Sequence, residues 1–207
     1  MYYGVELIDK KIIEKYLNYE NGFFVEVGGN DGVTQSNTAH LEYYKGWNGL
    51  LIEPITNKFN QMVLNRPKSI CINTCLSNVD DFEIEFIDVN LMSFIKNSRK
   101  SDENDNVWIK EGENCQNIKS IKYTLKTKKL QTIIEKNKIN SIDFFSLDVE
   151  GHELSVLEGL NFNHIRPKYI LIECTHKDEI FDFMYNNNYE CIDKFVVHDY
   201  LFKDKLL

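Results

Sequence analysis

The sequence has no run of about 18 apolar residues, so we predict no membrane span. It also has no dense lysine and arginine cluster, and its formal net charge is −8, which argues against nucleic acid or an anionic membrane as the main partner. The first ten residues, MYYGVELIDK, lack the basic start and apolar stretch of a signal peptide. The five cysteines are odd in number and contain no C-x-x-C pair, which favours reduced thiols. We therefore expect a cytoplasmic protein.

The residues that are present are those of a folded chain. Of 207 residues, 43% are hydrophobic, which is enough for a core, and no repeat or linker divides the chain. We predict a single domain over 1–207 that begins with a helix within 1–22. Apolar or alternating runs predict strands at 23–27, 49–52, 69–73, 82–87, 122–127, 142–147, 169–173, 189–193 and 195–202. Helical spacing and capping signals predict helices at 6–19, 36–44, 57–65, 130–136, 153–160 and 178–187.

The order of these elements indicates the fold class. Strands that alternate with helices are typical of a mostly parallel sheet with helices on both faces. The last two predicted strands follow each other almost directly, so they must form an antiparallel hairpin. The expected fold is α/β, with six parallel strands and a seventh inserted antiparallel.

The first predicted strand runs into a glycine-rich turn, FFVEVGGNDG. The missing side chains of Gly28, Gly29 and Gly32 would let a ligand approach the backbone, and Asn30 tolerates unusual φ angles. The dinucleotide fingerprint G-x-G-x-x-G is not met, and four further residues separate the turn from the next helix. Glu26, inside the strand, suits a cationic group such as an α-amine better than a pyrophosphate. An exposed position in the strand is the alternative for Glu26.

The second strand ends in Glu53, followed by Pro54. An acid about 20 residues beyond a glycine turn is where a ribose-binding carboxylate is expected, because it can accept both ribose hydroxyls. An ordinary acid at a helix start is the alternative. The turn and the acid together predict a nucleoside site at the carboxyl edge of the sheet.

Ionisable side chains crowd the turn after the fourth strand of the sheet, which reads SLDVEGHE. Asp148, Glu150, His152 and Glu153 could take a proton from a hydroxyl or supply oxygen ligands to a divalent ion. Capping of the following helix is the alternative for Asp148 and Glu150, and an exposed position is the alternative for His152. No H-x-x-x-H or Cys/His metal spacing is present.

Several motifs occur in the order found in one enzyme family: VEVGGNDG, SNTAHLE, GWNGLLIEP, NRP, LDVEGHELSVLEGL and YILIE. Over Phe23 to Glu173 the chain resembles the FkbM-type methyltransferases, which use S-adenosylmethionine. The resemblance implies the Rossmann-like class I methyltransferase fold with seven strands. It places Glu26, Gly28, Asn30 and Gly32 around the methionine part of the cofactor, Glu53 on the ribose, Ser77 near adenine, and Asp148 near the sulfonium and the acceptor. Where the family reads Ser-Asp, this chain has Ser77-Asn78.

Family members with assigned roles mostly methylate hydroxyl groups, so we expect a sugar, glycan or small-molecule acceptor. His152 is the leading general base, oriented by Glu150 or Asp148, with a pKa near 6.5 or higher because of the neighbouring acids. The polar stretch 88–120 is too long for a connector and is predicted to be a lid over the acceptor, with Trp108 stacked on a sugar or packed under the lid. A nicotinamide-dependent reductase and a non-catalytic partner subunit that binds S-adenosylmethionine are the alternatives.

Overall fold

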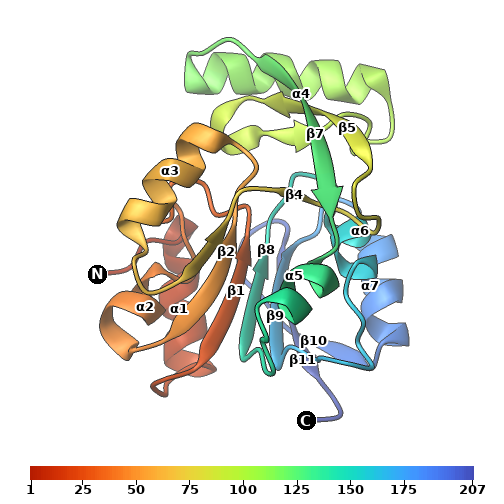
Figure 1. Ribbon diagram of the computed structural model, residues 1–207. Helices are drawn as coiled ribbons and strands as arrows, with labels where there is room; N and C mark the ends of the chain where they lie inside the picture. The colour runs from red at the N-terminus through yellow and green to blue at the C-terminus, as the bar shows by residue number, and fades with distance from the viewer.

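The computed structural model describes residues 1–207 and contains a central seven-stranded sheet (Figure 1). Its strands are β1 (Phe23–Val27), β2 (Asn48–Ile52), β3 (Ile70–Ile72), β8 (Phe144–Leu147), β9 (Tyr169–Glu173), β10 (Tyr189–Lys194) and β11 (Asp199–Asp204). They are ordered β10-β11-β9-β8-β1-β2-β3, and β11 runs antiparallel to both of its neighbours. The other pairs are parallel. The predicted parallel sheet with one antiparallel insertion is confirmed.

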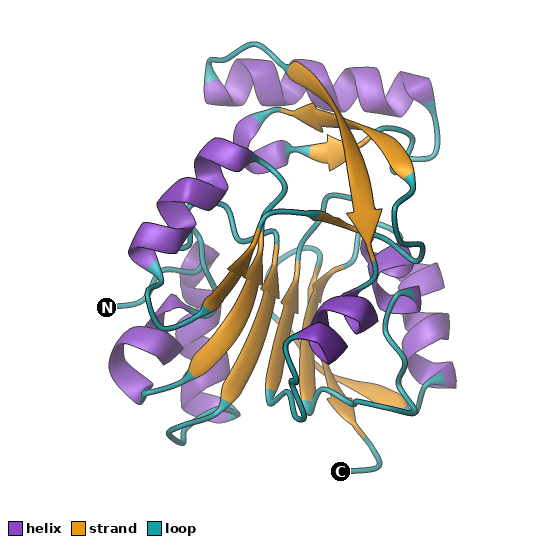
Figure 2. Ribbon diagram, viewed as in Figure 1, coloured by secondary structure: helices purple, strands orange, loops and turns teal.

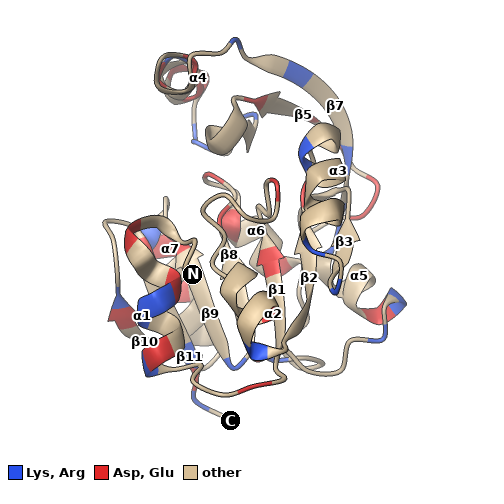
Figure 3. Cartoon of the chain, turned by 90° about the vertical axis from the view of Figure 1, so that its left-hand side faces the viewer, with Lys and Arg blue, Asp and Glu red and all other residues tan.

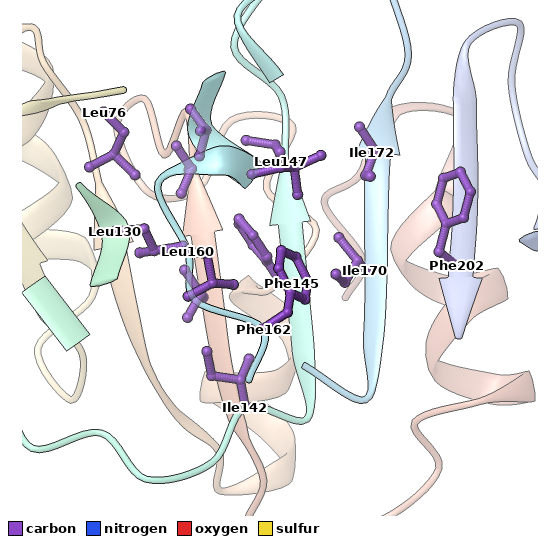
Figure 4. Close-up of a cluster of buried hydrophobic side chains, with 14 of the residues drawn as sticks. Leu76, Leu130, Ile142, Phe145, Leu147, Leu160, Phe162, Ile170, Ile172 and Phe202 are labelled. Carbon is purple, nitrogen blue, oxygen red and sulfur yellow. The ribbon is translucent and has the colours of Figure 1, made fainter. Parts of the chain in front are cut away.

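Helices cover both faces of this sheet (Figure 2). One face carries α1 (Ile8–Lys15), α2 (Ala39–Lys45) and α3 (Thr56–Asn65), and the other carries α5 (Leu130–Lys136), α6 (Glu153–Glu158) and α7 (Lys177–Asn186). The alternation of side chains along a strand divides the core between these groups. Phe24 packs with the first group, whereas Val25 and Val27 belong to the larger cluster beneath the second, part of which Figure 4 shows. None of the helices combines the length and the apolar composition that a membrane crossing requires.

A second, smaller sheet lies above the carboxyl ends of the parallel strands (Figure 1). It contains β4 (Cys75–Leu76), β5 (Glu83–Asp88), β6 (Phe94–Ile95) and β7 (Ile121–Lys128), in the order β4-β7-β5-β6. A 3₁₀ turn, η2 (Asn90–Met92), and a long helix, α4 (Asp102–Gln116), complete the layer. We call residues 83–128 the cap layer. The segment 88–120, predicted as a lid, lies within it.

The sequence-based prediction missed α4 because this helix has little apolar periodicity. Only Asp105 and Gly112 are buried in it. Its start is nevertheless well marked: the Ser101 hydroxyl accepts a hydrogen bond from the Asn104 N–H at 3.1 Å, and acidic residues fill the first turn. Both features stabilise a helix N-terminus. These capping signals, rather than hydrophobic spacing, could have identified the helix.

The strands predicted at 82–87 and 122–127 are present as β5 and β7, which pair with each other in the cap layer, outside the main sheet. Two further predictions were inaccurate. The C-terminal hairpin has a four-residue connection, 195–198, because β11 begins only at Asp199. The first helix ends at Lys15 rather than at Tyr19.

Gly49 in β2 leaves room for the aromatic ring of Phe24 on the neighbouring strand β1. It pairs directly with Phe24 of β1, and a Cβ built on Gly49 would lie 2.0 Å from the Phe24 ring. Phe24 is fully buried, so its ring cannot swing into solvent. The first two strands therefore reach their turns with a fixed spacing that a larger residue at 49 would disturb.

We predict that Gly49→Ala lowers the free energy of unfolding by about 1–3 kcal/mol, because overpacking forces the ring or the backbone to move. Urea denaturation followed by circular dichroism measures the change. Leu64→Ala is the control, since Leu64 is 80% exposed and its truncation should change stability by less than about 0.5 kcal/mol. A Gly49→Ala variant as stable as the wild type would contradict the packing described here.

Candidate cofactor and active site

A cavity opens between the carboxyl ends of β1, β2 and β8 and the cap layer. Turns after the strands form its floor, and Phe86, Asn90, Leu91, Ser93 and Ile95 of the cap layer form its upper wall. Ligands of open α/β sheets bind at this edge, where the strand order reverses between β1 and β8. Figure 3 shows the acidic turns that face the cap layer there.

The Glu26 carboxylate is buried and holds the loop that follows the glycine turn. Its oxygens accept hydrogen bonds from the hydroxyls of Ser36 at 2.9 Å and Thr38 at 2.6 Å, and from the Asn37 N–H at 2.9 Å. Arg66 Nη1 lies 3.5 Å from the same carboxylate. Glu26 is therefore not the exposed strand residue of the alternative. Its direct contact with a cofactor stays a prediction, while its contacts within the protein shape the cavity wall.

The glycines of the first turn make room for the protein itself. A Cβ on Gly28 would lie 2.0 Å from the Asp148 carbonyl oxygen, and Gly28 has a φ of +87°. A Cβ on Gly29 would lie 2.8 Å from the Met62 sulfur. These missing side chains let β1 approach β8 and α3, which differs from the expectation that they open space for a ligand. Gly28 and Gly29 still line the cavity with their backbone.

The Glu53 side chain lines the cavity, and backbone N–H groups bind both of its carboxylate oxygens. Asn30 N–H donates to one oxygen and Ile55 N–H to the other, each at 2.8 Å. Each oxygen keeps a further lone pair, so the group can accept two hydroxyls. Burial raises the pKa of Glu53 to about 7. The two backbone hydrogen bonds lower the pKa, but by less than burial raises it. Pro54 and Ile55 continue the wall beside it.

Three carboxyl groups meet where β8 and β9 end. Oxygens of Asp148, Glu150 and Glu173 all lie within 4.8 Å of one another. Asp148 is accessible from the cavity, but the protein atoms packed around its carboxyl group, together with the Glu173 carboxylate, raise its pKa well above the ordinary value. Burial, followed by a neighbouring acid, also raises the pKa of Glu150 to about 8 and that of Glu173 to about 7. The cluster can therefore hold and accept protons near neutral pH, and its oxygens are also donors of the kind Mg²⁺ takes.

The cap layer is tied to this cluster by Arg99. Its Nη1 donates to the Glu150 carboxylate at 3.3 Å and to the Glu150 carbonyl oxygen at 3.1 Å. The guanidinium lies 3.6 Å from the centre of the Trp108 ring, whose indole N–H donates to the Met92 carbonyl at 3.1 Å. Of the two alternatives for Trp108, the structure supports packing within the cap layer.

His152 lies apart from the acids expected to orient it. Its Nε2 is 3.1 Å from the Ser77 hydroxyl, and no hydrogen bond joins it to Asp148 or Glu150. Burial lowers its pKa to about 4, so the expected value of 6.5 or higher is wrong. Glu153 accepts the Gly151 N–H at 2.8 Å and serves as the capping acid of this turn.

Most predicted site residues line the one cavity: Glu26, Gly28, Gly29, Asn30, Glu53, Pro54, Asp148, Glu150 and His152. Gly32 and Ser77 do not. Gly32 packs against Arg66 and Met62, and the Ser77 hydroxyl contacts His152, which lines the cavity. The sequence did not identify Glu173, although it ends a strand in the same way as Glu53, nor the wall residues of the cap layer, which no motif marks.

The fold is that of class I S-adenosylmethionine-dependent methyltransferases. A TehB-like methyltransferase from Corynebacterium glutamicum matches with a TM-score of 0.50 at 8% identity, over 95% of this chain and 87% of that one. TrmK from M. capricolum, solved with S-adenosylhomocysteine, matches with a TM-score of 0.50 at 10% identity, over 97% of this chain and 68% of that one. No curated protein matches the chain in sequence.

These distant structures show the fold alone. The model of the methyltransferase FkbM domain matches residues 26–191, from the strand before the glycine turn to the C-terminal hairpin. This match includes every residue placed in the cavity. The chain belongs to the FkbM methyltransferase domain family.

Proposed function

We propose that this protein transfers the methyl group of S-adenosylmethionine to a hydroxyl of a sugar, glycan or small molecule. The observation that carries the proposal is the Glu53 carboxylate, fixed by two backbone N–H groups and facing the cavity with capacity for two more hydrogen bonds. The two hydroxyls of a ribose match that capacity. Family membership supports the cofactor, and the cavity supports its placement.

The charge of the cavity supports a cationic cofactor over a dinucleotide. Its lining includes Glu26, Glu53, Asp148 and Glu150 but no lysine or arginine. A sulfonium favours the ionised form of these carboxyl groups, whereas a pyrophosphate finds no cation in the lining to pair with. The helix after β1 begins only at Ala39, so no helix N-terminus follows the glycine turn directly. Both features disfavour the nicotinamide-dependent reductase.

The residues that line the cavity also favour one class of acceptor. A neutral sugar or glycan hydroxyl can enter such a cavity, whereas a phosphorylated acceptor would find no lysine or arginine in the lining to pair with. Asn90 and Ser93 of the cap layer add polar groups to the upper wall, which is suited to hydrogen bonds with hydroxyls. In this proposal the segment 88–120 covers the acceptor.

S-adenosylmethionine supplies an electrophilic methyl group for in-line attack, so the protein mainly positions the reactants. The acceptor oxygen must also lose its proton, and a general base contributes typically about 10²–10⁴-fold to the rate. Asp148 and Glu150 line the cavity and have raised pKa values, so the proposal assigns the proton to this pair. His152 retains a neutral imidazole beside Ser77 and has a binding role on the adenine side.

Calorimetric titration of the protein with S-adenosylmethionine, S-adenosylhomocysteine and NAD tests the cofactor assignment. We expect binding of the first two and none of NAD. Binding of NAD alone would overturn the proposal in favour of the reductase. Transfer of labelled methyl to neutral glycans then separates an enzyme from a partner subunit that binds the cofactor without turnover.

The affinity for S-adenosylhomocysteine should rise about tenfold between pH 6 and pH 8, because the ionised, hydroxyl-accepting form of Glu53 increases as the pH passes its pKa of about 7. In Glu53→Gln the affinity at pH 8 should fall about tenfold, and the pH dependence should flatten. Calorimetry across this range measures both. Because Glu150 and Glu173 titrate in the same range, the test compares the pH dependence of affinity in the wild type with that in Glu53→Gln. The same pH dependence in both proteins would refute the ribose contact.

Removal of the imidazole should leave the chemistry largely intact. With an acceptor found in the glycan screen, we expect His152→Ala to lower kcat less than about tenfold, and Asp148→Asn to lower it about 10²-fold or more. The rate of the wild type should rise with pH between about 7 and 8, as the carboxyl cluster ionises, and His152→Ala should keep that rise. Loss of the rise in His152→Ala would return the role of base to the imidazole.

Chelation distinguishes a proton from a metal ion in the carboxyl cluster. If Asp148 and Glu150 take the proton themselves, EDTA leaves turnover unchanged. Loss of activity with EDTA that is restored by Mg²⁺ would instead assign the cluster to a divalent cation.

A further inference from the structure

Arg66 occupies a buried position directly behind the cofactor cavity. It follows the last residue of α3 and precedes Pro67, in the motif NRP that no step of the proposed reaction uses. Its side chain is 0% exposed, and it is not among the residues that line the cavity. A guanidinium in this position is costly to bury unless its donors are paired, so its contacts indicate why it is there.

One part of the guanidinium binds the glycine turn and the loop after it. Arg66 Nη1 donates to the Gly32 carbonyl oxygen at 2.9 Å and to the Ser36 hydroxyl oxygen at 3.2 Å, with Glu26 at 3.5 Å. Nη2 donates to the Thr38 hydroxyl oxygen at 2.9 Å. A single planar group therefore joins both segments that form this side of the cavity.

The other part binds α2. Arg66 Nε donates to the Glu42 carboxylate at 2.8 Å, and Glu42 also accepts the Lys68 N–H at 3.1 Å and the Ser69 hydroxyl. The plane of the guanidinium lies over the Phe24 ring, 5.1 Å from its centre. Phe24 and Glu26 are on the same face of β1, so strand alternation brings the ring and the carboxylate to the same arginine.

Lysine could not make these contacts. Five N–H groups in a fixed fork reach Gly32, Ser36, Thr38 and two carboxylates at once, whereas an ammonium offers three donors from one atom. Loss of the guanidinium would leave Glu26 without its cation. It would also remove the hydrogen bonds that join residues 28–38 to the end of α3. The strands behind it would keep their own hydrogen bonds.

We propose that Arg66 is a positioning residue for cofactor binding, which fixes residues 28–38 in their binding conformation without touching the cofactor. This inference rests on the proposed function. In it, Glu26 acts through the same network, because its carboxylate joins Arg66 to Ser36 and Thr38. Cofactor affinity therefore depends on a charge outside the cavity.

Arg66→Lys, with Arg166→Lys as the matched control, tests the proposal. Arg166 makes a comparable two-fold contact, with its Nε and Nη2 each 2.7 Å from the Asp204 carboxylate, on the opposite edge of the sheet. Binding of S-adenosylhomocysteine is titrated at a temperature where both variants are folded, as checked by circular dichroism. We expect Arg66→Lys to weaken binding about tenfold or more and Arg166→Lys to change it less than about twofold.

Amide hydrogen exchange gives a readout that does not need the ligand. In Arg66→Lys, exchange should quicken about tenfold or more in residues 28–38 and stay unchanged in β8 and β9, because the opening is local. Faster exchange through all strands alike, or wild-type affinity in Arg66→Lys, would overturn the inference. If the wild type itself fails to bind S-adenosylhomocysteine, the proposed function falls, and the exchange pattern alone decides the role of Arg66.

Should Arg66→Lys not fold, Thr38→Val gives the same test with a smaller change. It removes one acceptor of Arg66 Nη2 and one donor to Glu26 while the arginine remains. We expect a loss of affinity in the same direction and faster exchange in 28–38. An unchanged affinity and exchange in this variant would overturn the inference.

Discussion

The close approach of β1 and β8 at their carboxyl ends is the constraint on which the site depends. Gly28 lies so near the Asp148 carbonyl oxygen that a Cβ would be 2.0 Å away from it. This contact brings the turn after β1 beside the turn after β8, so that Glu53, Asp148 and Glu150 share one cavity. The glycines thus build the site indirectly, by allowing protein atoms to pack behind the surface that a ligand meets.

Charge then determines what this cavity can accept. Acids at the ends of β1, β2 and β8 line it. The cations nearest to them, Arg66 and Arg99, lie outside the lining and pair with Glu26 and Glu150. Burial raises the pKa values of Glu53, Asp148 and Glu150, and a lining without lysine or arginine favours cationic or neutral ligands. In the proposed function, this arrangement receives the sulfonium, takes the proton of the acceptor hydroxyl, and offers no cation to a phosphate.

The sequence was informative where function depends on local order and less so where it depends on distant contacts. Glu53 was identifiable because the spacing from a glycine turn and the end of a strand are both visible in the chain. Glu173 and Arg66 acquire their roles from partners more than 20 residues away, which no local pattern reveals. His152 shows a different limit: adjacency to Asp148 and Glu150 in the chain did not predict the direction of its side chain, which turns toward Ser77. The segment 88–120 was set apart as a lid from the sequence, but α4 within it was missed because capping rather than hydrophobic spacing marks it.

The central claim is that the cavity binds the nucleoside of the cofactor through Glu53. A crystal structure of the protein with S-adenosylhomocysteine tests it most directly. We predict both ribose hydroxyls at about 2.5–3.0 Å from the Glu53 carboxylate oxygens, with the Asn30 and Ile55 N–H groups still bound to the same carboxylate. A ribose placed elsewhere in the cavity, with Glu53 bonded only to the backbone, would contradict the account.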